Sequence, residues 1–159
     1  MSSLTYTHHT RSQLTDIDIQ HIWLITLNNI SHFYSRSTDG WNPEFKKREL
    51  FHRCARFILV HDDQSTLVAF AMYRKHLNVA YCYELQVLDQ VRRRGVGTIL
   101  VQHIEDYATL NNLTEINLTV FTCKSSFYPS HLLFLMYLQS MNRPYASIML
   151  CRTSISICI

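Results

Sequence analysis

Apolar residues recur at helical spacing in two long stretches of the chain, residues 14–34 and 96–109. Each stretch gathers its apolar side chains on one broad face, a pattern that predicts an amphipathic helix. Thr15 or Asp16 would cap the first of these helices. A shorter helix is predicted over residues 43–51, because asparagine, proline and glutamate occupy its cap, its first position and its first turn.

Short apolar runs between turn-forming residues are typical of strands. Residues 56–61, 66–74 and 81–87 follow one another with polar turns between them, so we expect an antiparallel meander. A further strand, residues 114–122, comes after the second long helix and should therefore lie parallel to residues 81–87. A weaker pattern over residues 3–9 predicts an edge strand.

The chain has 159 residues, of which 47% are hydrophobic, and this is enough for one globular domain with a substantial core. Its net charge of +3 is mild and does not by itself indicate a nucleic-acid partner. Lys46, Lys47 and Arg48 are expected on a solvated face of the short helix. Residues 1–13 lack the apolar segment of a signal peptide, and the longest apolar run, residues 132–138, is too short to span a bilayer.

Cysteine and histidine usage gives no sign of a metal centre. The five cysteines, at positions 54, 82, 123, 151 and 158, are odd in number and lack the paired spacing of metal ligands. Reduced thiols in the nucleus or the cytoplasm are therefore expected. The nine histidines are scattered, with His8 and His9 the one close pair, so no metal is expected.

Two of the three glycines, Gly95 and Gly97, follow Arg92, Arg93 and Arg94 and open the second long helix. Glycine allows unusual torsions and close approach of a ligand, and N–H groups at a helix N-terminus can converge on an anion. The segment predicts an anion cradle, although a basic turn before an amphipathic helix is the plainer interpretation. It is neither a P-loop nor a dinucleotide fingerprint, because the residues and glycine spacing of those motifs are missing.

The pattern Arg-x-x-Gly-x-Gly at residues 92–97 resembles the acetyl-CoA signature of the Gcn5-related N-acetyltransferases. Within them, the chain resembles the N-alpha-acetyltransferase D family, which acetylates the N-termini of histone four and histone two-A. The similarity covers residues 14–123. It is carried further by four flanking segments: residues 33–34, 40–41, 81–86 and 118–121.

This resemblance implies an α/β acetyltransferase fold, a mixed and mostly antiparallel sheet flanked by helices, with acetyl-CoA as cosubstrate. It implies that strand 81–87 bulges, splays from its parallel neighbour and offers main-chain groups to the pantetheine arm. The cofactor-binding residues that it implies are Leu85, Gln86, Val87, Arg92, Arg93, Arg94, Gly95, Val96, Gly97 and Thr98.

Glu84 is the candidate catalytic base, because a carboxylate is out of place inside an apolar and aromatic strand. Burial would raise the pKa of this carboxyl, and an α-amine, with a pKa of about 7.7–8.0, needs only a modest base. The alternative is that Glu84 merely pairs with a lysine or an arginine. Cys82 has no histidine nearby in the sequence, so direct transfer without an acyl-enzyme is expected.

Tyr83 is the second candidate catalytic residue, since by the resemblance it binds the substrate end. A local bulge would have to bring Tyr83 and Glu84 to the same cleft. Tyr34 and Trp41 would wall a peptide channel, or else pack in the core. The substrate-binding residues that the resemblance implies are Tyr34, Trp41, Tyr81, Tyr83 and Thr119.

Three features depart from the family pattern. Residues 75–78 carry no acid where the family has one, Lys124 replaces an expected asparagine, and residues 125–159 match nothing in the family. We therefore predict a domain core over residues 1–123 and a divergent tail over residues 124–159 in the same domain. The tail is either a native part of the enzyme or a product of gene structure that leaves the fold incomplete.

The predicted function is acetyl transfer from acetyl-CoA to the N-terminal α-amine of a protein, with a histone N-terminal peptide starting Ser-Gly-Arg-Gly-Lys as partner. A monomer in the nucleus and the cytoplasm is expected, with no direct binding to nucleic acid or membrane. Two alternatives are a broader N-terminal or lysine acetyltransferase and a non-catalytic or truncated acetyl-CoA-binding product. A nucleic-acid module is disfavoured, because residues 92–94 lack interleaved aromatic residues.

Overall fold

The computed structural model describes residues 3–34, 40–119, 146–149 and 157–158. The helices are α1 (Asp16–Tyr34), α2 (Pro43–Leu50) and α3 (Val96–Leu110), with short 3-10 turns η1 (Arg11–Gln13) and η2 (Asp89–Val91). The strands are β1 (Thr5–Thr10), β2 (Arg56–His61), β3 (Leu67–His76), β4 (Val79–Val87), β5 (Glu115–Thr119), β6 (Ala146–Met149) and β7 (Ile157–Cys158).

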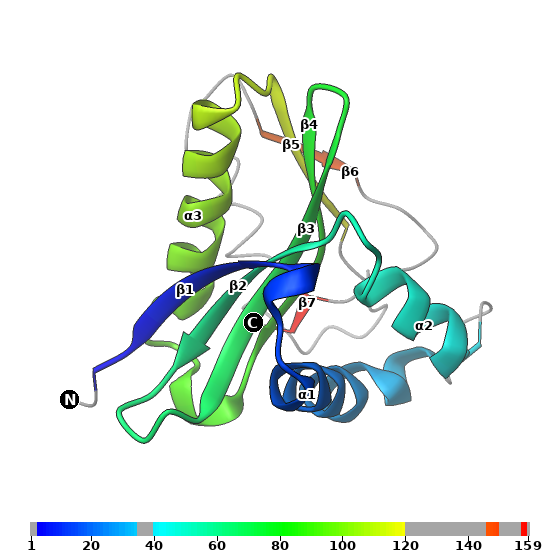
Figure 1. Ribbon diagram of the computed structural model, residues 1–159, viewed down its shortest axis with the longest axis vertical. Coiled ribbons are helices and arrows are strands. Elements are labelled where there is room, and N and C mark those ends of the chain that lie inside the picture. The colour runs from blue at the N-terminus through cyan, green and yellow to red at the C-terminus, as the bar shows by residue number, and fades with distance from the viewer. Residues whose placement is uncertain (1–2, 35–39, 120–145, 150–156, 159) are drawn as a thin grey trace, which may run out of the picture.

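The strands form one mixed sheet in the order β1-β2-β3-β4-β5-β6, and β7 pairs with β4 beside this path. Strands β1 to β4 are antiparallel to their neighbours, whereas β5 is parallel to β4. Helix α3 lies on one face of the sheet, and α1 and α2 lie on the other (Figure 1). The predicted meander, the parallel strand after α3 and the flanked mixed sheet are confirmed.

Side-chain caps fix where the first two helices begin. Thr15 Oγ1 accepts the Asp18 N–H at 3.1 Å, and the Asp18 carboxylate accepts the Thr15 N–H at 2.9 Å. Asn42 Oδ1 accepts the Phe45 N–H at 3.0 Å. These bonds satisfy backbone donors that have no partner inside the helix. The predicted caps at Thr15 and Asn42 are therefore confirmed.

The hairpin between β3 and β4 is tighter than its sequence predicts. Strand β3 continues to His76, which pairs with Val79, so the turn is only Leu77 and Asn78. Leu77 takes the left-handed conformation, with φ of 51°. The predicted turn over residues 75–78 is wrong at its start, because the cross-strand ladder continues through two more pairs, Lys75 with Ala80 and His76 with Val79. As a result, His76 belongs to β3 and its side chain projects from the sheet, not from a turn.

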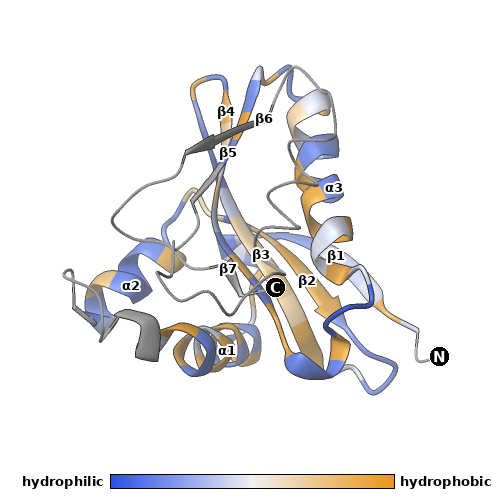
Figure 2. Cartoon of the chain, turned by 180° about the vertical axis from the view of Figure 1, so that it is seen from behind, coloured by the Kyte–Doolittle hydropathy of each residue, from blue (hydrophilic) through white to orange (hydrophobic). Residues whose placement is uncertain are grey.

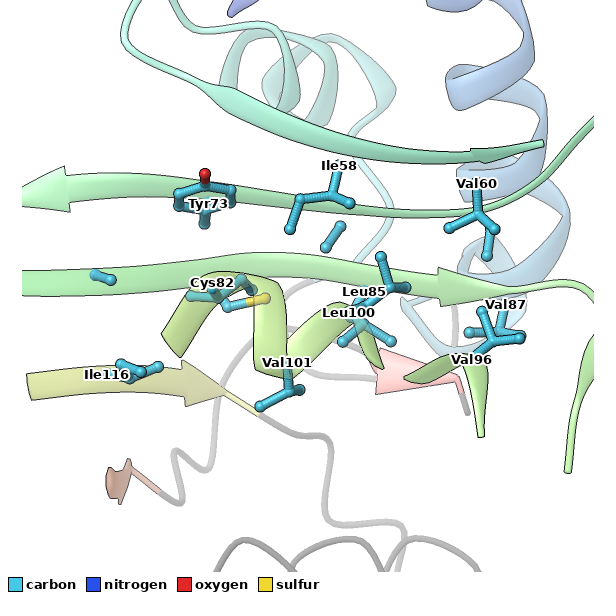
Figure 3. Packing of buried hydrophobic residues seen from close by; sticks show 14 of the residues in the cluster. Ile58, Val60, Tyr73, Cys82, Leu85, Val87, Val96, Leu100, Val101 and Ile116 are labelled. Atoms are coloured by element: carbon cyan, nitrogen blue, oxygen red, sulfur yellow. The ribbon is translucent and has the colours of Figure 1, made fainter. Parts of the chain in front are cut away.

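Two hydrophobic clusters hold the layers together. The larger lies between the sheet and α3, where Leu100 and Val101 meet strand residues such as Cys82 and Leu85 (Figure 3). The second lies between the other face and α1, with Phe70 of β3 fully buried in it. Burying each such side chain stabilises the fold by about 1.5–3 kcal/mol. The strand that carries the candidate site, β4, is covered by both clusters.

Helix α2 contains one position that contradicts the sequence prediction. The helix is largely hydrophilic (Figure 2), and its three consecutive basic residues were expected in solvent. Lys47 and Arg48 are exposed as predicted, but Lys46 is only 3% exposed. Lys46 lies four residues before the buried Leu50, and therefore on the same side of the helix, toward the sheet. The prediction for Lys46 is wrong because it considered only the polarity of the run.

Two segments of the predicted tail belong to the described residues. Strand β6 pairs in parallel with β5, and β7 pairs in parallel with β4. Lys124 and residues 125–145 lie outside the described residues. The division of the chain at residue 123 stays a prediction.

Candidate active site

A β-bulge in β4 organises the site. The register pairs Met72 with Glu84 and Tyr73 with Cys82, so Tyr83 is an extra residue without a partner on β3. Cys82 packs in the cluster under α3, whereas Tyr83 packs against the opposite cluster and Glu84 contacts α2. Successive residues of a regular strand point to opposite faces, and the bulge removes that alternation. The bulge is confirmed, and it places Tyr83 and Glu84 on the same side of the sheet.

Glu84 is fully buried within a polar network that joins three elements. Its Oε1 forms an ion pair with Lys46 Nζ of α2, and its Oε2 accepts a hydrogen bond from Gln86 Nε2 at 2.7 Å. Asn29 Nδ2 of α1 donates to Gln86 Oε1 at 3.1 Å, and Lys46 Nζ also contacts Glu49 Oε2 at 2.6 Å. The network therefore ties α1 and α2 to the bulged part of β4.

Burial and charge act on the pKa of Glu84 in opposite directions. Desolvation raises it, the Lys46 ammonium and the Gln86 hydrogen bond lower it, and the nearby Glu49 carboxylate raises it again. The net effect is a raised pKa. The lysine partner that was the alternative interpretation of Glu84 is thus present, while the raised pKa fits a base. The catalytic role of Glu84 stays a prediction.

Beside this network, four side chains form a partly open cluster at the end of the β3–β4 pair. Tyr83 Oη and His76 Nε2 are 2.7 Å apart. The Tyr81 and Tyr83 rings lie 4.6 Å apart, and the Arg74 guanidinium lies 4.2 Å from the centre of the Tyr83 ring. Arg74 also donates a hydrogen bond to the Glu49 carbonyl. The phenol of Tyr83 is therefore held between a cation and an exposed imidazole.

The segment before α3 adopts the conformation expected of an anion cradle. Gly95 is the N-cap, in the left-handed region with φ of 78°, and Arg93 before it also has a positive φ, of 59°. No side chain caps the helix at Gly95. The first helical hydrogen bond is donated by Ile99, to Gly95 O at 3.1 Å, which leaves the N–H groups of residues 96–98 at the helix end. These groups and the helix dipole favour an anion.

The three arginines before α3 differ in their surroundings. Arg92 Nε donates to Val87 O at 3.1 Å, and its Nη1 is 2.5 Å from Asp89 Oδ1. Arg92 therefore fastens the turn between β4 and α3, a structural role that its place in the motif did not reveal. Arg93 and Arg94 are exposed next to the helix end.

The implied cofactor edge of β4 carries another strand in this structure. Pairing with β5 runs from Val79 to Cys82, and past that point Leu85 and Gln86 pair with β7. The resemblance assigns the main chain of residues 85–87 to the pantetheine arm. A ligand that used this edge would take the position of β7.

Two predicted substrate residues have undescribed side chains. Tyr34 ends α1 and Thr119 ends β5, and nothing in the described residues tests their roles. Trp41 lies 6.1 Å from Trp23, centre to centre, in a stacked arrangement, and the Lys47 ammonium lies 5.0 Å from the Trp23 ring. Trp41 is thus partly buried against α1, and both the channel and the packing interpretations of Trp41 stay predictions. Tyr81 lies in the open cluster beside Tyr83.

Cys82 has the surroundings of a structural thiol. It is buried in the cluster under α3, and burial together with the Glu84 charge raises its pKa well above the usual range. Since the thiolate is the nucleophilic form, this environment disfavours an acyl-enzyme at Cys82. The observation supports direct transfer.

The sequence patterns did not indicate three residues of the site: Lys46, Arg74 and His76. Lys46 could have been found from its spacing to Leu50 on α2. Arg74 and His76 alternate along β3 and face the side of the sheet on which Tyr83 packs, but their register depends on the bulge. No local signal gives that register.

Two features of other classes of site are absent from the described residues. No described helix is long and apolar enough to cross a membrane. The described residues contain no group of three or more histidine, cysteine, aspartate or glutamate side chains that could hold a metal ion.

Comparison with known proteins identifies the class that this fold and site define. Residues 23–128 match the acetyltransferase (GNAT) family. The chain belongs to the GNAT family of acetyltransferases.

Solved structures share the fold at low sequence identity. An acetyltransferase of GNAT family from Staphylococcus aureus Mu50 is 12% identical, with a TM-score of 0.61 over 85% of this chain and 83% of the other. The ribosomal-protein-S18-alanine N-acetyltransferase from Escherichia coli is 16% identical, with a TM-score of 0.58 over 87% and 77% of the two chains. The PaiA N-acetyltransferase from Thermoplasma acidophilum, in complex with coenzyme A, is 16% identical, with a TM-score of 0.60 over 87% and 88%.

The cradle can be tested with a matched pair of glycine variants. Gly95 and Gly40 both have positive φ, and a Cβ added at either would meet no atom within 4 Å. Gly95→Ala and Gly40→Ala should therefore each destabilise the fold by about 1–2 kcal/mol through backbone strain. Only Gly95→Ala should raise the Kd for acetyl-CoA, by about tenfold, if relaxing the loop costs about 1.4 kcal/mol of binding. If calorimetry gave equal acetyl-CoA affinities for the two variants, the segment before α3 would not be part of the cofactor site.

Proposed function

We propose that this GNAT acetyltransferase transfers an acetyl group from acetyl-CoA to the N-terminal α-amine of a protein. The observation that carries the proposal is the bulge of β4, which places Tyr83 and Glu84 together on one side of the strand that leads to the α3 cradle. A cofactor cradle, a base and a polar group beside the reacting atoms are the components that acyl transfer to an amine requires.

The residues at the start of α3 fit a pyrophosphate. The N–H groups of residues 96–98, the left-handed Gly95 and the exposed Arg93 and Arg94 together make a positive, open helix end. Bound there, acetyl-CoA would supply an acetyl group already activated as a thioester. Leu85, Gln86 and Val87 would orient its arm through their main chain, and this requires β7 to leave that edge.

Glu84 is the proposed base for the amine, directly or through one water. Its raised pKa brings the carboxylate closer to the pKa of an α-amine, about 7.7–8.0, and this favours proton transfer near neutral pH. Lys46 now holds the carboxylate, but Lys46 also contacts Glu49. If Lys46 shifted toward Glu49, the Glu84 carboxylate would be free to act as a base, and the Lys46 ammonium would still be paired with Glu49.

The acceptor that we propose is a histone N-terminal peptide with the start Ser-Gly-Arg-Gly-Lys, in the nucleus and the cytoplasm. This proposal rests on the resemblance of residues 14–123 to the histone-directed family, with Tyr34, Trp41, Tyr81 and Thr119 as the channel. The ribosomal-protein-S18-alanine N-acetyltransferase from Escherichia coli has the same fold, and its name specifies a protein as acceptor. A protein acceptor is therefore compatible with this fold. We further propose that the protein is a monomer and binds neither nucleic acid nor membrane directly.

A coenzyme A release assay tests the function with three acceptors. They are the Ser-Gly-Arg-Gly-Lys peptide, the same peptide with a blocked α-amine, and an unrelated peptide with one internal lysine and a blocked N-terminus. We expect release with the first peptide alone. Equal release with the blocked peptides would identify a lysine acetyltransferase, and acetyl-CoA binding without release would identify a non-catalytic binding protein.

A further inference from the structure

The hydrogen bond between His76 and Tyr83 joins the candidate site to solvent. It links the end of β3 to the bulged residue of β4, with 2.7 Å between Nε2 and Oη. His76 is exposed, whereas Tyr83 is partly buried against the cluster under α1. A proton that reached Tyr83 could therefore pass to water, or come from it, through a single imidazole.

Glu84 cannot share this route. Its carboxylate is fully buried between Lys46 and Gln86. Acyl transfer to an amine needs two proton movements, one away from the amine and one toward the leaving sulfur. The bulge provides two adjacent residues with different access to water, and each suits one of these movements.

We propose that His76 and Tyr83 form a proton relay that protonates the thiolate leaving during acetyl transfer. This inference rests on the proposed function. Tyr83 is the donor to sulfur, and His76 acts through Tyr83 as a positioning and proton-supplying residue.

The surroundings of Tyr83 suit a donor. Burial raises the pKa of the phenol, and the Arg74 guanidinium lowers it, with a raised pKa as the result. The phenol is therefore protonated at neutral pH, which is the state that a proton donor requires. The Tyr81 ring and the Arg74 guanidinium pack on the Tyr83 ring and limit its rotation. The other titratable groups near the pair are Tyr81 of β4, Glu49 of α2 and His52 just after α2.

The step balances without an additional reactant. The C–N bond forms as the amine loses one proton to Glu84, and the C–S bond breaks with its electron pair going to sulfur. Tyr83 Oη gives its proton to that sulfur, and the Nε2–H of His76 replaces it. Nδ1 of His76 then takes a proton from water, so the imidazole changes tautomer and stays neutral. The water that supplied this proton is left as hydroxide, and the proton that Glu84 later releases to solvent neutralises it. The net products are therefore an amide and a thiol.

Chemical rescue separates this relay from a structural role for His76. In His76→Ala, the single-turnover rate of acetyl transfer to the Ser-Gly-Arg-Gly-Lys peptide should fall about 10²-fold, the low end of the range for acid–base catalysis. The peptide and acetyl-CoA affinities should change little. Added imidazole should restore part of the rate, because the exposed position leaves room for it.

Three further variants make the test decisive. His76→Gln, which can hydrogen bond to Tyr83 but cannot relay a proton, should stay slow. The double variant His76→Ala with Tyr83→Phe should gain nothing from imidazole. Lys75→Ala, an exposed neighbour on β3, should keep the wild-type rate.

The outcomes distinguish the relay from the function. A His76→Ala enzyme with the wild-type rate, or a loss that imidazole does not restore, overturns the relay and leaves the proposed function standing. A wild-type chain that binds acetyl-CoA but transfers nothing to any peptide overturns both.

Discussion

Replacing Lys46 by methionine is expected to lower the free energy of unfolding by about 3–5 kcal/mol, the usual cost of breaking a buried ion pair on one side. Lys46 and Glu84 are 3% and 0% exposed, so the variant leaves a carboxylate in the core without its cation. Lys47→Met is the matched control, since the Lys47 side chain is 45% exposed and its Nζ is 3.6 Å from Glu44 Oε1. That surface pair should contribute less than about 1 kcal/mol.

The Lys46→Met deficit should depend on pH with a definite sign. The pKa of Glu84 is raised in the folded state, so the stability linked to this group is present below its unfolded pKa and is lost as pH rises through the folded pKa. Removing Lys46 removes a contribution that lowers this pKa, so the folded pKa rises further. The deficit should therefore grow as pH rises.

Urea unfolding of wild type and Lys46→Met from pH 5 to pH 8 measures this dependence. A second change, Glu84→Met in the Lys46→Met background, should recover most of the loss, because the fully buried carboxylate is then gone and Glu49, which also loses Lys46, is partly exposed. A deficit equal to that of Lys47→Met would show that the ion pair does not hold the fold.

The second large effect is expected on turnover. Glu84→Gln should lower the rate of acetyl transfer by about 10²–10⁴-fold, as loss of a general base does. The affinity for acetyl-CoA should change little, because the cradle at the start of α3 is a separate element. The fold should survive, since Lys46 keeps Glu49 as its partner at 2.6 Å and an amide can accept the hydrogen bond from Gln86.

A pH series separates a catalytic Glu84 from a structural one. The rate of the Glu84→Gln variant should partly recover as pH rises past the pKa of the peptide α-amine, about 7.7–8.0. Above that pH the amine is already deprotonated and needs no general base. A variant that is fully active at neutral pH would assign Glu84 to structure alone. A uniform loss together with weaker acetyl-CoA binding would mean that the network supports the cradle.

Periodic patterns and local caps predicted the elements of this fold well. The apolar face of α1, the Asn-Pro-Glu start of α2 and the glycines before α3 are signals within a few residues of each other, and tertiary packing agreed with them. The prediction that Lys46 is solvated was wrong because it considered the polarity of the run and not the four-residue spacing to Leu50, which gives the burial but not the ion pair. Its partner, Glu84, lies far along the chain, and no local pattern links the two residues.

The candidate site likewise has parts that the local sequence predicts and parts that depend on contacts between distant residues. The cradle follows from the local sequence of residues 92–98, and the structure gives it the expected left-handed glycine. The bulge at Tyr83 was expected only from a family resemblance. The contacts of His76 and Arg74 with Tyr83 depend on the register that this bulge creates, and the pairing of β7 with β4 joins segments about seventy residues apart. Long-range register is the part that side-chain periodicity does not encode.

The position of the transferred acetyl group tests the central claim most directly. The chain would be incubated with isotope-labelled acetyl-CoA and the Ser-Gly-Arg-Gly-Lys peptide, and the product would be fragmented in a mass spectrometer. We expect the label on the α-amine of the serine and on no lysine, with the product lost in the Glu84→Gln variant at neutral pH. Label on the lysine side chain alone, or no labelled peptide from a chain that binds acetyl-CoA, would contradict the assignment as an N-terminal acetyltransferase.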